Sequence, residues 1–234
     1  MANYREPQWL LPNEKNLAMP ASDATVGSGL AEDRQSLYSM DFDGSNDYIN
    51  ITSASSLNFG TGDLTYSVWV KADFSSSNRY FIGTASDPTT NNGGIAIGVH
   101  ASQYPSWRVW FSGTMFDTGT AAIVDGQWHH VVLTRSSGTV QVYVDGQVDG
   151  ASATITTSIT NSADIRIGQL MNGLEYWDGK IDELAIWNRA LSASEVSALA
   201  TASAPANILA LSDKPVAYYP LGEQARLGSE WQFP

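Results

Sequence analysis

Apolar and polar residues alternate along most of the chain, and this alternation is the pattern of half-buried β-strands. The segment LTYSVWVKA (64–72) places large apolar residues at every second position, on one expected face: Leu64, Tyr66, Val68 and Val70. Trp69 falls on the opposite face. The same alternation predicts strands in further segments: 36–51, 79–85, 93–100, 107–113, 163–170 and 179–188.

The segment 128–150, WHHVVLTRSSGTVQVYVDGQVDG, gives the strongest hairpin signal. Two alternating runs flank Ser136-Ser137-Gly138, and the second run ends at Asp145-Gly146. Gly and Asp are the residues that tight turns between paired strands prefer. We therefore expect two neighbouring antiparallel strands here.

One short helix is predicted late in the chain, over SASEVSALA (192–200). Ser192 is followed three residues later by Glu195, which is the spacing of a capping box at a helix N-terminus. Many short strands with a single late helix indicate an all-β, two-sheet antiparallel sandwich rather than alternating β-α units.

Five segments, in order, resemble the laminin-G-like, concanavalin A-like jelly-roll domain of lectins and glucanases: YSMDFDGSNDYINI, LTYSVWVKA, GQWHHVVLTRSSGTVQVYVDGQ, IRIGQ and GKIDELAIWNRALSASEVSAL. The resemblance covers about residues 36–200. It implies two antiparallel sheets packed face to face, with the Trp-His-His strand beside the VYVDG strand. The expected organisation is an extended N-terminal arm over 1–36, the jelly roll over 37–200, and a linker with a C-terminal strand over 201–234.

The C-terminal strand is displaced from the place that the resemblance implies. Domains of this kind usually begin with a strand written like LVAYYPLDE, tens of residues before FDGSNDY, whereas PVAYYPLGE (215–223) follows the helix here. The strand can close its own sheet, as in a circular permutant, or complete a neighbouring copy's sheet in a head-to-tail assembly. The residues that would pair are Val216, Tyr218, Tyr219 and Leu221.

The composition excludes several partners. The net charge of −12 argues against nucleic acid and against anionic membrane surfaces, both of which require clustered Lys and Arg. The sequence contains no cysteine, so disulfides and thiolate metal sites are impossible. No signal peptide and no membrane span is recognisable, which predicts cytoplasmic synthesis and an extracellular or virion location reached by another exit.

Catalysis is not predicted. His129 and His130 are adjacent on a strand, so their side chains point to opposite faces and cannot share a metal ion. A glucanase of this fold needs carboxylates at alternate positions of one strand, and LEYWDGKIDEL lacks them. Its acids are Glu175, Asp178, Asp182 and Glu183.

Calcium is the cofactor that the acidic residues suit better, because Ca²⁺ takes carboxylate and carbonyl oxygens. By the resemblance, the Asp of IDEL lies near the FDGSNDY turn, so the expected ligands are Asp43, Asp182 and the carbonyl of Gly44. The alternative is that Asp43 only forms an Asx-turn and Asp182 ends a strand.

Carbohydrate binding would use exposed aromatic rings that stack on a sugar. QYPSWRVW (103–110) and LEYWDG (174–179) place aromatics near turns: Tyr104, Trp107, Tyr176 and Trp177. The sequence thus predicts a non-catalytic structural, assembly or adhesion module of a fibre or phage-like virion. The alternatives are a calcium-dependent carbohydrate-binding module and, with less support, a glycoside hydrolase.

Overall fold

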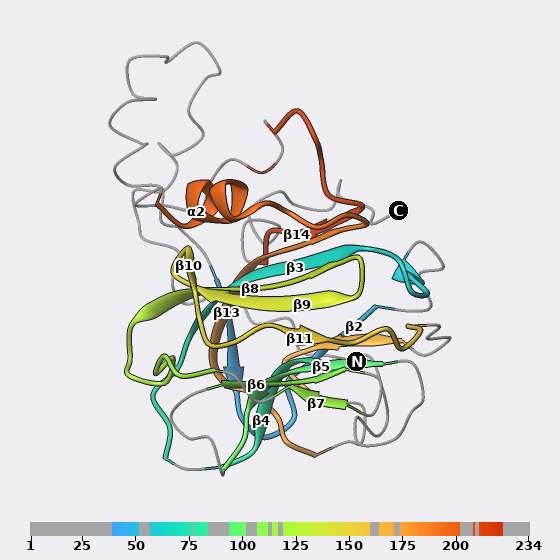
Figure 1. Ribbon diagram of the computed structural model, residues 1–234. Coiled ribbons are helices and arrows are strands. Elements are labelled where there is room, and N and C mark those ends of the chain that lie inside the picture. Colours follow the sequence, from blue (N-terminus) through green and yellow to red (C-terminus); the bar gives the residue numbers. More distant parts are fainter. Residues whose placement is uncertain are drawn as a thin grey trace, which may run out of the picture.

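The structure, a computed structural model, describes residues 39–51, 57–75, 77–83, 94–101, 107–111, 114–116, 119–159, 164–170, 174–201, 208 and 211–221. The predicted N-terminal arm, residues 1–36, lies outside these ranges. The described residues form two antiparallel sheets packed face to face, with one helix on the outside (Figure 1). The predicted two-sheet sandwich is confirmed.

The first sheet has the strand order β1-β13-β3-β8-β9-β10, with β11 also pairing with β9 and β14 also pairing with β13. Its strands are β1 (Met40–Asp43), β3 (Leu64–Lys71), β8 (Trp128–Ser136), β9 (Thr139–Val144), β10 (Gln147–Val148), β11 (Ala153–Thr154), β13 (Asp178–Trp187) and β14 (Ala217–Tyr219). The predicted hairpin is present, because β8 and β9 pair antiparallel across the turn at Ser137 and Gly138.

The second sheet has the order β2-β12-β4-β5-β6-β7. Its strands are β2 (Ile49–Ile51), β4 (Arg79–Gly83), β5 (Ile95–Val99), β6 (Trp107–Phe111), β7 (Thr114–Phe116) and β12 (Ile165–Ile167). The turn at 43–46 therefore does not form a hairpin between its flanking strands, since β1 pairs with β13 and β2 pairs with β12. This turn carries the chain from one sheet to the other.

The core fills the space between the two sheets, as the sequence alternation requires. In β3 the predicted face, Leu64 to Val70, is buried, and Trp69 on the other face is half-buried. β8 and β9 supply Val131, Leu133 and the valines of the VYVDG strand, and β5 faces them with Ile95 and Ile97. The removal of this apolar surface from water is the main stabilisation of the sandwich.

Helix α2 (Ala193–Thr201) covers the outer face of the first sheet (Figure 1). The predicted capping box is present: the Glu195 carboxylate accepts from the Ser192 backbone N–H (2.8 Å), and the Ser192 hydroxyl accepts from the Glu195 N–H (3.3 Å). Val196 and Leu199 pack on Trp187 of β13. The described part of the chain contains no helix with the length and apolar character needed to cross a membrane.

β14 pairs with β13 of the same chain, in line with β1. β14 lies opposite Leu184–Ile186, and β1 lies opposite residues 178–181, on the same side of β13 and running in the same direction. Tyr219 and Leu221 pack into the core, while Tyr218 packs under α2 on the outer face. Two segments from opposite ends of the chain thus form one interrupted strand.

The interruption coincides with an irregularity in β13. The register between β13 and β3 shifts between Asp182 and Ala185, and Glu183 has a φ of 52°. Such a bulge bends a strand and re-aims its side chains. Glu183 there accepts a hydrogen bond from the Tyr218 hydroxyl, which ties β14 to the bulge.

Candidate functional site

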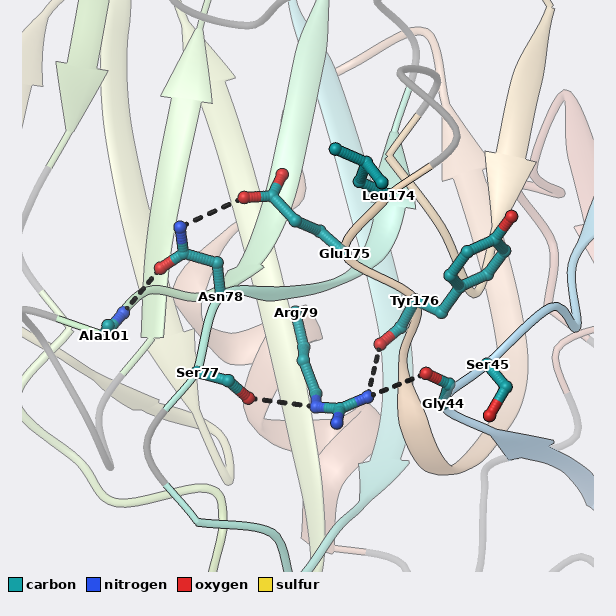
Figure 2. A pocket seen from close by; sticks show the side chains of 9 residues that line it. All are labelled: Gly44, Ser45, Ser77, Asn78, Arg79, Ala101, Leu174, Glu175 and Tyr176. Carbon is teal, nitrogen blue, oxygen red and sulfur yellow. Dashed lines mark hydrogen bonds between the residues drawn. The ribbon is translucent and has the colours of Figure 1, made fainter.

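A cleft of about 630 Å³ opens where four loop segments meet (Figure 2). Its lining comes from the turn after β1, the start of β4 with the residues just before it, Ala101 after β5, and the segment before β13. The lining residues are Gly44, Ser45, Ser77, Asn78, Arg79, Ala101, Leu174, Glu175 and Tyr176. The cleft is therefore built from sequence-distant segments that the jelly roll brings together.

Arg79 holds these segments in place. Its Nε donates to the Ser77 hydroxyl (3.0 Å), and its Nη1 donates to the carbonyls of Gly44 (3.2 Å) and Tyr176 (2.9 Å), as Figure 2 shows. The other terminal nitrogen lies 3.7 Å from the Asp178 carboxylate. The guanidinium is thus a structural clamp, and its planar geometry suits several acceptors at once.

The turn after β1 must come close to this clamp. Gly44 has a φ of 73°, and a Cβ atom at this position would lie 2.5 Å from Arg79 Nη1. Only glycine adopts this backbone conformation at low cost while leaving room for the guanidinium. The glycine of the FDGSNDY segment is therefore explained by the approach of Arg79.

Glu175 and Asn78 present polar groups to the cleft. Asn78 Nδ2 donates to Glu175 Oε1 (3.0 Å), and Asn78 Oδ1 accepts from the Ala101 backbone N–H (2.8 Å). Because the backbone N–H fixes the oxygen of the amide, the amide nitrogen must face the carboxylate. Next to Glu175, Tyr80 is buried, and burial raises the pKa of its phenol to about 12.

Glu175 adopts a strained backbone conformation. Its φ is 59°, a left-handed value that costs roughly 1–2 kcal/mol for a residue other than glycine. The Glu175 carbonyl accepts from the Tyr80 N–H (3.3 Å), which helps to hold the segment in place. Strained residues of this kind cluster at functional sites, so Glu175 becomes the first candidate for ligand contact.

Leu174 and Tyr176 flank Glu175 and give the cleft an apolar part. Leu174 is 64% exposed, which is unusual for a large aliphatic side chain, and Tyr176 is partly exposed. Tyr176 is the predicted sugar-stacking residue that the structure brings to the cleft. Sequence reasoning did not single out Asn78, Arg79 or Leu174.

The prediction that Trp107 and Trp177 stack on a sugar is wrong, because both side chains are buried. Trp107 is 1% exposed and donates through Nε1 to the Asp149 carboxylate (2.8 Å). Trp177 is 0% exposed and packs edge-on against Phe74 and Phe81. Tyr104 lies outside the described residues.

The predicted calcium ligands are not brought together. Asp43 lies opposite Asp178 in the β1–β13 pair, whereas Asp182 is buried on β13 opposite Trp69. The Asp43 carboxylate accepts from the Ser45 N–H (2.8 Å), which is the Asx-turn alternative. Among the described residues, no group of three or more acids or histidines could hold a metal ion. The residues as placed do not form a calcium donor set.

The two adjacent histidines have different surroundings, as predicted for opposite faces. His130 is buried, hydrogen-bonds Ser67 (2.8 Å) through Nε2 and stacks on Trp69. Burial lowers the pKa of His130 to about 4, although the negative charge of Asp145 acts in the opposite direction. His129 hydrogen-bonds both Asp145 and Asp125. These carboxylates raise the pKa of His129, Asp145 more strongly than Asp125, although burial acts in the opposite direction.

The acids weighed for hydrolysis do not form a catalytic pair on an open face. Asp182 is 2% exposed and Glu183 is 8% exposed, with Glu183 bonded to Tyr218. Asp178 is engaged with Arg79. Glu175 is thus the acid of this group that lines the cleft.

The two antiparallel sheets, packed face to face, define a jelly-roll domain, and the cleft lies where its loops meet. The chain belongs to the concanavalin A-like lectin/glucanases superfamily, whose laminin-G-like profile matches residues 43–197. This finding confirms the resemblance that the sequence segments carried.

Individual relatives are distant. A rat protein, "Sushi, von Willebrand factor type A, EGF and pentraxin domain-containing protein 1", is 28% identical over 111 residues, which are 43% of this chain and 3% of that protein. The chain therefore corresponds to a small fraction of that relative's length.

Two of the solved structures that are similar in fold illustrate the likeness. A heptameric SAP-like pentraxin from Limulus polyphemus has a TM-score of 0.55 at 19% identity, over 72% of this chain and 82% of the pentraxin. Domain 4 of an extracellular arabinanase from Geobacillus stearothermophilus, in complex with arabinotriose, has a TM-score of 0.51 at 24% identity, over 70% and 76% of the two chains. At these identities the likeness concerns the fold alone.

Proposed function

We propose that this domain is a non-catalytic carbohydrate-binding module that holds its ligand in the cleft around Glu175 and Tyr176. The observation that carries the proposal is the strained Glu175, whose carboxylate accepts from the Asn78 amide in a cleft that Leu174 and Tyr176 also line (Figure 2). Sugars need this combination, because each ring has an apolar face and a rim of hydroxyls. We propose binding rather than hydrolysis, and the described lining of the cleft, which holds one acid and not a pair, supports this choice.

The family supports this reading without deciding it. Members share a sandwich whose loops carry different sites, so function has to be argued from the residues of the site. The arabinanase domain was solved with arabinotriose, which makes neutral oligosaccharides a suitable first panel. Laminin-G-like domains typically act outside the cell, and this family membership supports the proposal that this domain acts there. A virion is the alternative location that we propose.

A glycan array followed by calorimetry tests the proposal. We expect Tyr176→Ala and Asn78→Ala to weaken binding about tenfold or more, because each removes one part of the sugar contact. Tyr48→Ala is the matched control, since Tyr48 is an exposed tyrosine that packs over Arg166 and does not line the cleft. Binding to no glycan on the array, or equal losses in all three variants, would reject the proposal.

Calcium dependence is the finer form of this function and is tested separately. The predicted ligands Asp43, Gly44 and Asp182 do not converge, and the Gly44 carbonyl already accepts from the Arg79 guanidinium. We therefore propose that sugar binding in the cleft does not require calcium. Glycan affinity that disappears with a chelator and returns with added Ca²⁺ would contradict this proposal.

A structural or assembly role in a fibre or virion is the second candidate. The observation that favours it is the position of β14, which fills a place beside β13 through a segment that follows α2. An identical segment of a second copy would make the same pairing at little cost. Light scattering of the full chain and of a chain ending at Thr201 tests it.

The two outcomes differ clearly. If the full chain forms larger species and the shortened one is a monomer, β14 joins copies. If the full chain is a monomer and the shortened one unfolds, β14 closes its own sheet and the assembly role falls.

A further inference from the structure

The charged groups that line the cleft, Glu175 and Arg79, determine whether it can take an anion. The Glu175 carboxylate can only accept, whereas Asn78 uses one N–H on Glu175 and its oxygen on the Ala101 N–H. Among the described lining residues, Arg79 is the cationic one. Whether an anion can bind therefore depends on how far Arg79 is engaged.

Two nitrogens of Arg79 make hydrogen bonds within the protein, and the third lies at ion-pair distance from a carboxylate. Nε and Nη1 donate to three protein oxygens, and Nη2 lies beside the Asp178 carboxylate at 3.7 Å. An anion in the cleft would have to displace a carbonyl that holds the loops together, or compete with Asp178. It would also meet Glu175 and, at longer range, a chain of net charge −12. Arg108 acts electrostatically on Tyr80, but it is buried and does not line the cleft.

The backbone supports a role for the Glu175 carboxylate itself. A glycine at this position would avoid the cost of the left-handed conformation, yet the chain carries a long acidic side chain there. That side chain is oriented by Asn78, which is oriented in turn by the Ala101 N–H. The acceptor is thus positioned before any ligand arrives, which lowers the entropic cost of binding.

We propose that the cleft selects uncharged sugars, which donate hydroxyl hydrogens, and rejects sugars that carry carboxylate, sulfate or phosphate, and that Glu175 enforces this selection. The inference rests on the proposed carbohydrate-binding function. It adds the ligand class and names one residue as its determinant. Sugar hydroxyls can donate to the Glu175 carboxylate, whereas an anionic group would face a like charge there.

Matched glycan pairs test the selection. The array should present each neutral oligosaccharide beside its sialylated and sulfated forms, and the best pair should then be measured by calorimetry with the full chain. We expect the wild type to bind the neutral member about tenfold or more tightly. Glu175→Gln removes the charge and keeps the shape, so the ratio of neutral to acidic affinity should fall at least several-fold.

Asp125→Asn is the matched control. It changes the net charge by the same amount, but Asp125 contacts His129 and does not line the cleft. Its affinity ratio should equal that of the wild type. A ratio that shifts equally in both variants would reduce the effect to overall charge and overturn the role of Glu175.

The failures are distinguishable. A wild type that binds the acidic member as tightly as the neutral one, or more tightly, overturns the selection while leaving carbohydrate binding intact. A wild type that binds neither class rejects the proposed function, and the selection falls with it.

Discussion

Glu175 and Ser137 are both non-glycine residues with positive φ, at 59° and 47°, but they stand in different surroundings. Ser137 lies in the β8–β9 turn, where the conformation is part of a tight hairpin, and its N–H donates to Asp63. Glu175 lies in the cleft. The two positions allow backbone strain to be separated from ligand contact.

We predict that Glu175→Gly leaves the stability unchanged or raises it by up to about 1 kcal/mol, because glycine relieves the strain while the bond to Asn78 is lost. Glycan binding should fall at least tenfold in the same variant. Ser137→Gly should also not destabilise, and it should keep full glycan affinity. Urea unfolding and calorimetry on both variants check this, and a Glu175→Gly protein that binds normally would contradict it.

Asp149 illustrates what the sequence cannot disclose at the residue scale. Its buried carboxylate accepts from Trp107 Nε1 and from the backbone N–H groups of Thr120 and Ala121. The sequence predicts that Trp107 begins a strand next to a turn, and it does begin β6, but its ring is buried in the core rather than exposed at the turn. Burial depends on which strands become partners, and no local spacing contains that information.

Acid should destabilise the protein through His130. Its pKa of about 4 in the folded state lies below the unfolded value of 6.5, so the unfolded chain binds the extra proton between these values. The contribution of His130 to the free energy of unfolding is therefore fully present above pH 6.5 and is lost as the pH falls toward 4. We predict a loss on the order of 2 kcal/mol between pH 7 and pH 5 from this residue. Most of that loss should be absent in His130→Gln, as measured by urea unfolding at the two pH values.

His129 provides a control of opposite sign. Its pKa is raised by Asp145 and Asp125, so it adds stability below pH 6.5 and loses it as the pH rises through the folded value. His129→Gln should therefore make the acid loss larger. Equal pH dependence in the wild type and both variants would show that other groups control acid stability.

At the scale of elements, the sequence predicts the individual strands and the helix better than it predicts how these elements connect and pair in space. The alternation in LTYSVWVKA and the Ser192–Glu195 spacing correctly predict β3 and α2, since both depend on a local period or cap. The cleft is not visible in the sequence, because Asn78 and Glu175 stand 97 positions apart. The turn at 43–46 is visible as a turn, but not as a crossing between sheets.

We predict that Gly44→Ala destabilises the protein by about 1–3 kcal/mol and weakens glycan binding. Its Cβ would add a collision with Arg79 to the cost of a positive φ. Gly60→Ala is the matched control, because Gly60 has a φ of 54° and a Cβ atom there would meet nothing within 4 Å. Gly60→Ala should show only the backbone cost and keep its affinity. Thermal unfolding and calorimetry compare the two variants, and equal behaviour would disprove the clamp role of Arg79.

At the scale of the whole molecule, β14 and β1 form one line beside β13 although they come from opposite ends of the chain. The resemblance implies that a strand like β14 usually precedes the FDGSNDY segment. The structure pairs β14, which follows α2 in the chain, with β13 beside β1. Contacts rather than chain order determine whether the sheet can form, provided that the connections reach.

A circular permutant tests this directly. We predict that a chain in which Pro234 is joined to Met1 and new ends are opened between Thr201 and Ile208 folds to the same two sheets, because no described strand or helix is cut. Its circular dichroism and glycan affinity should match those of the natural order. As a control, a permutant opened between Ser67 and Val68 cuts β3, which pairs with β13 and β8, and should not fold. If the first permutant fails while its joined linker is intact, then β14 needs its covalent link to α2, and the sheet is not closed by contacts alone.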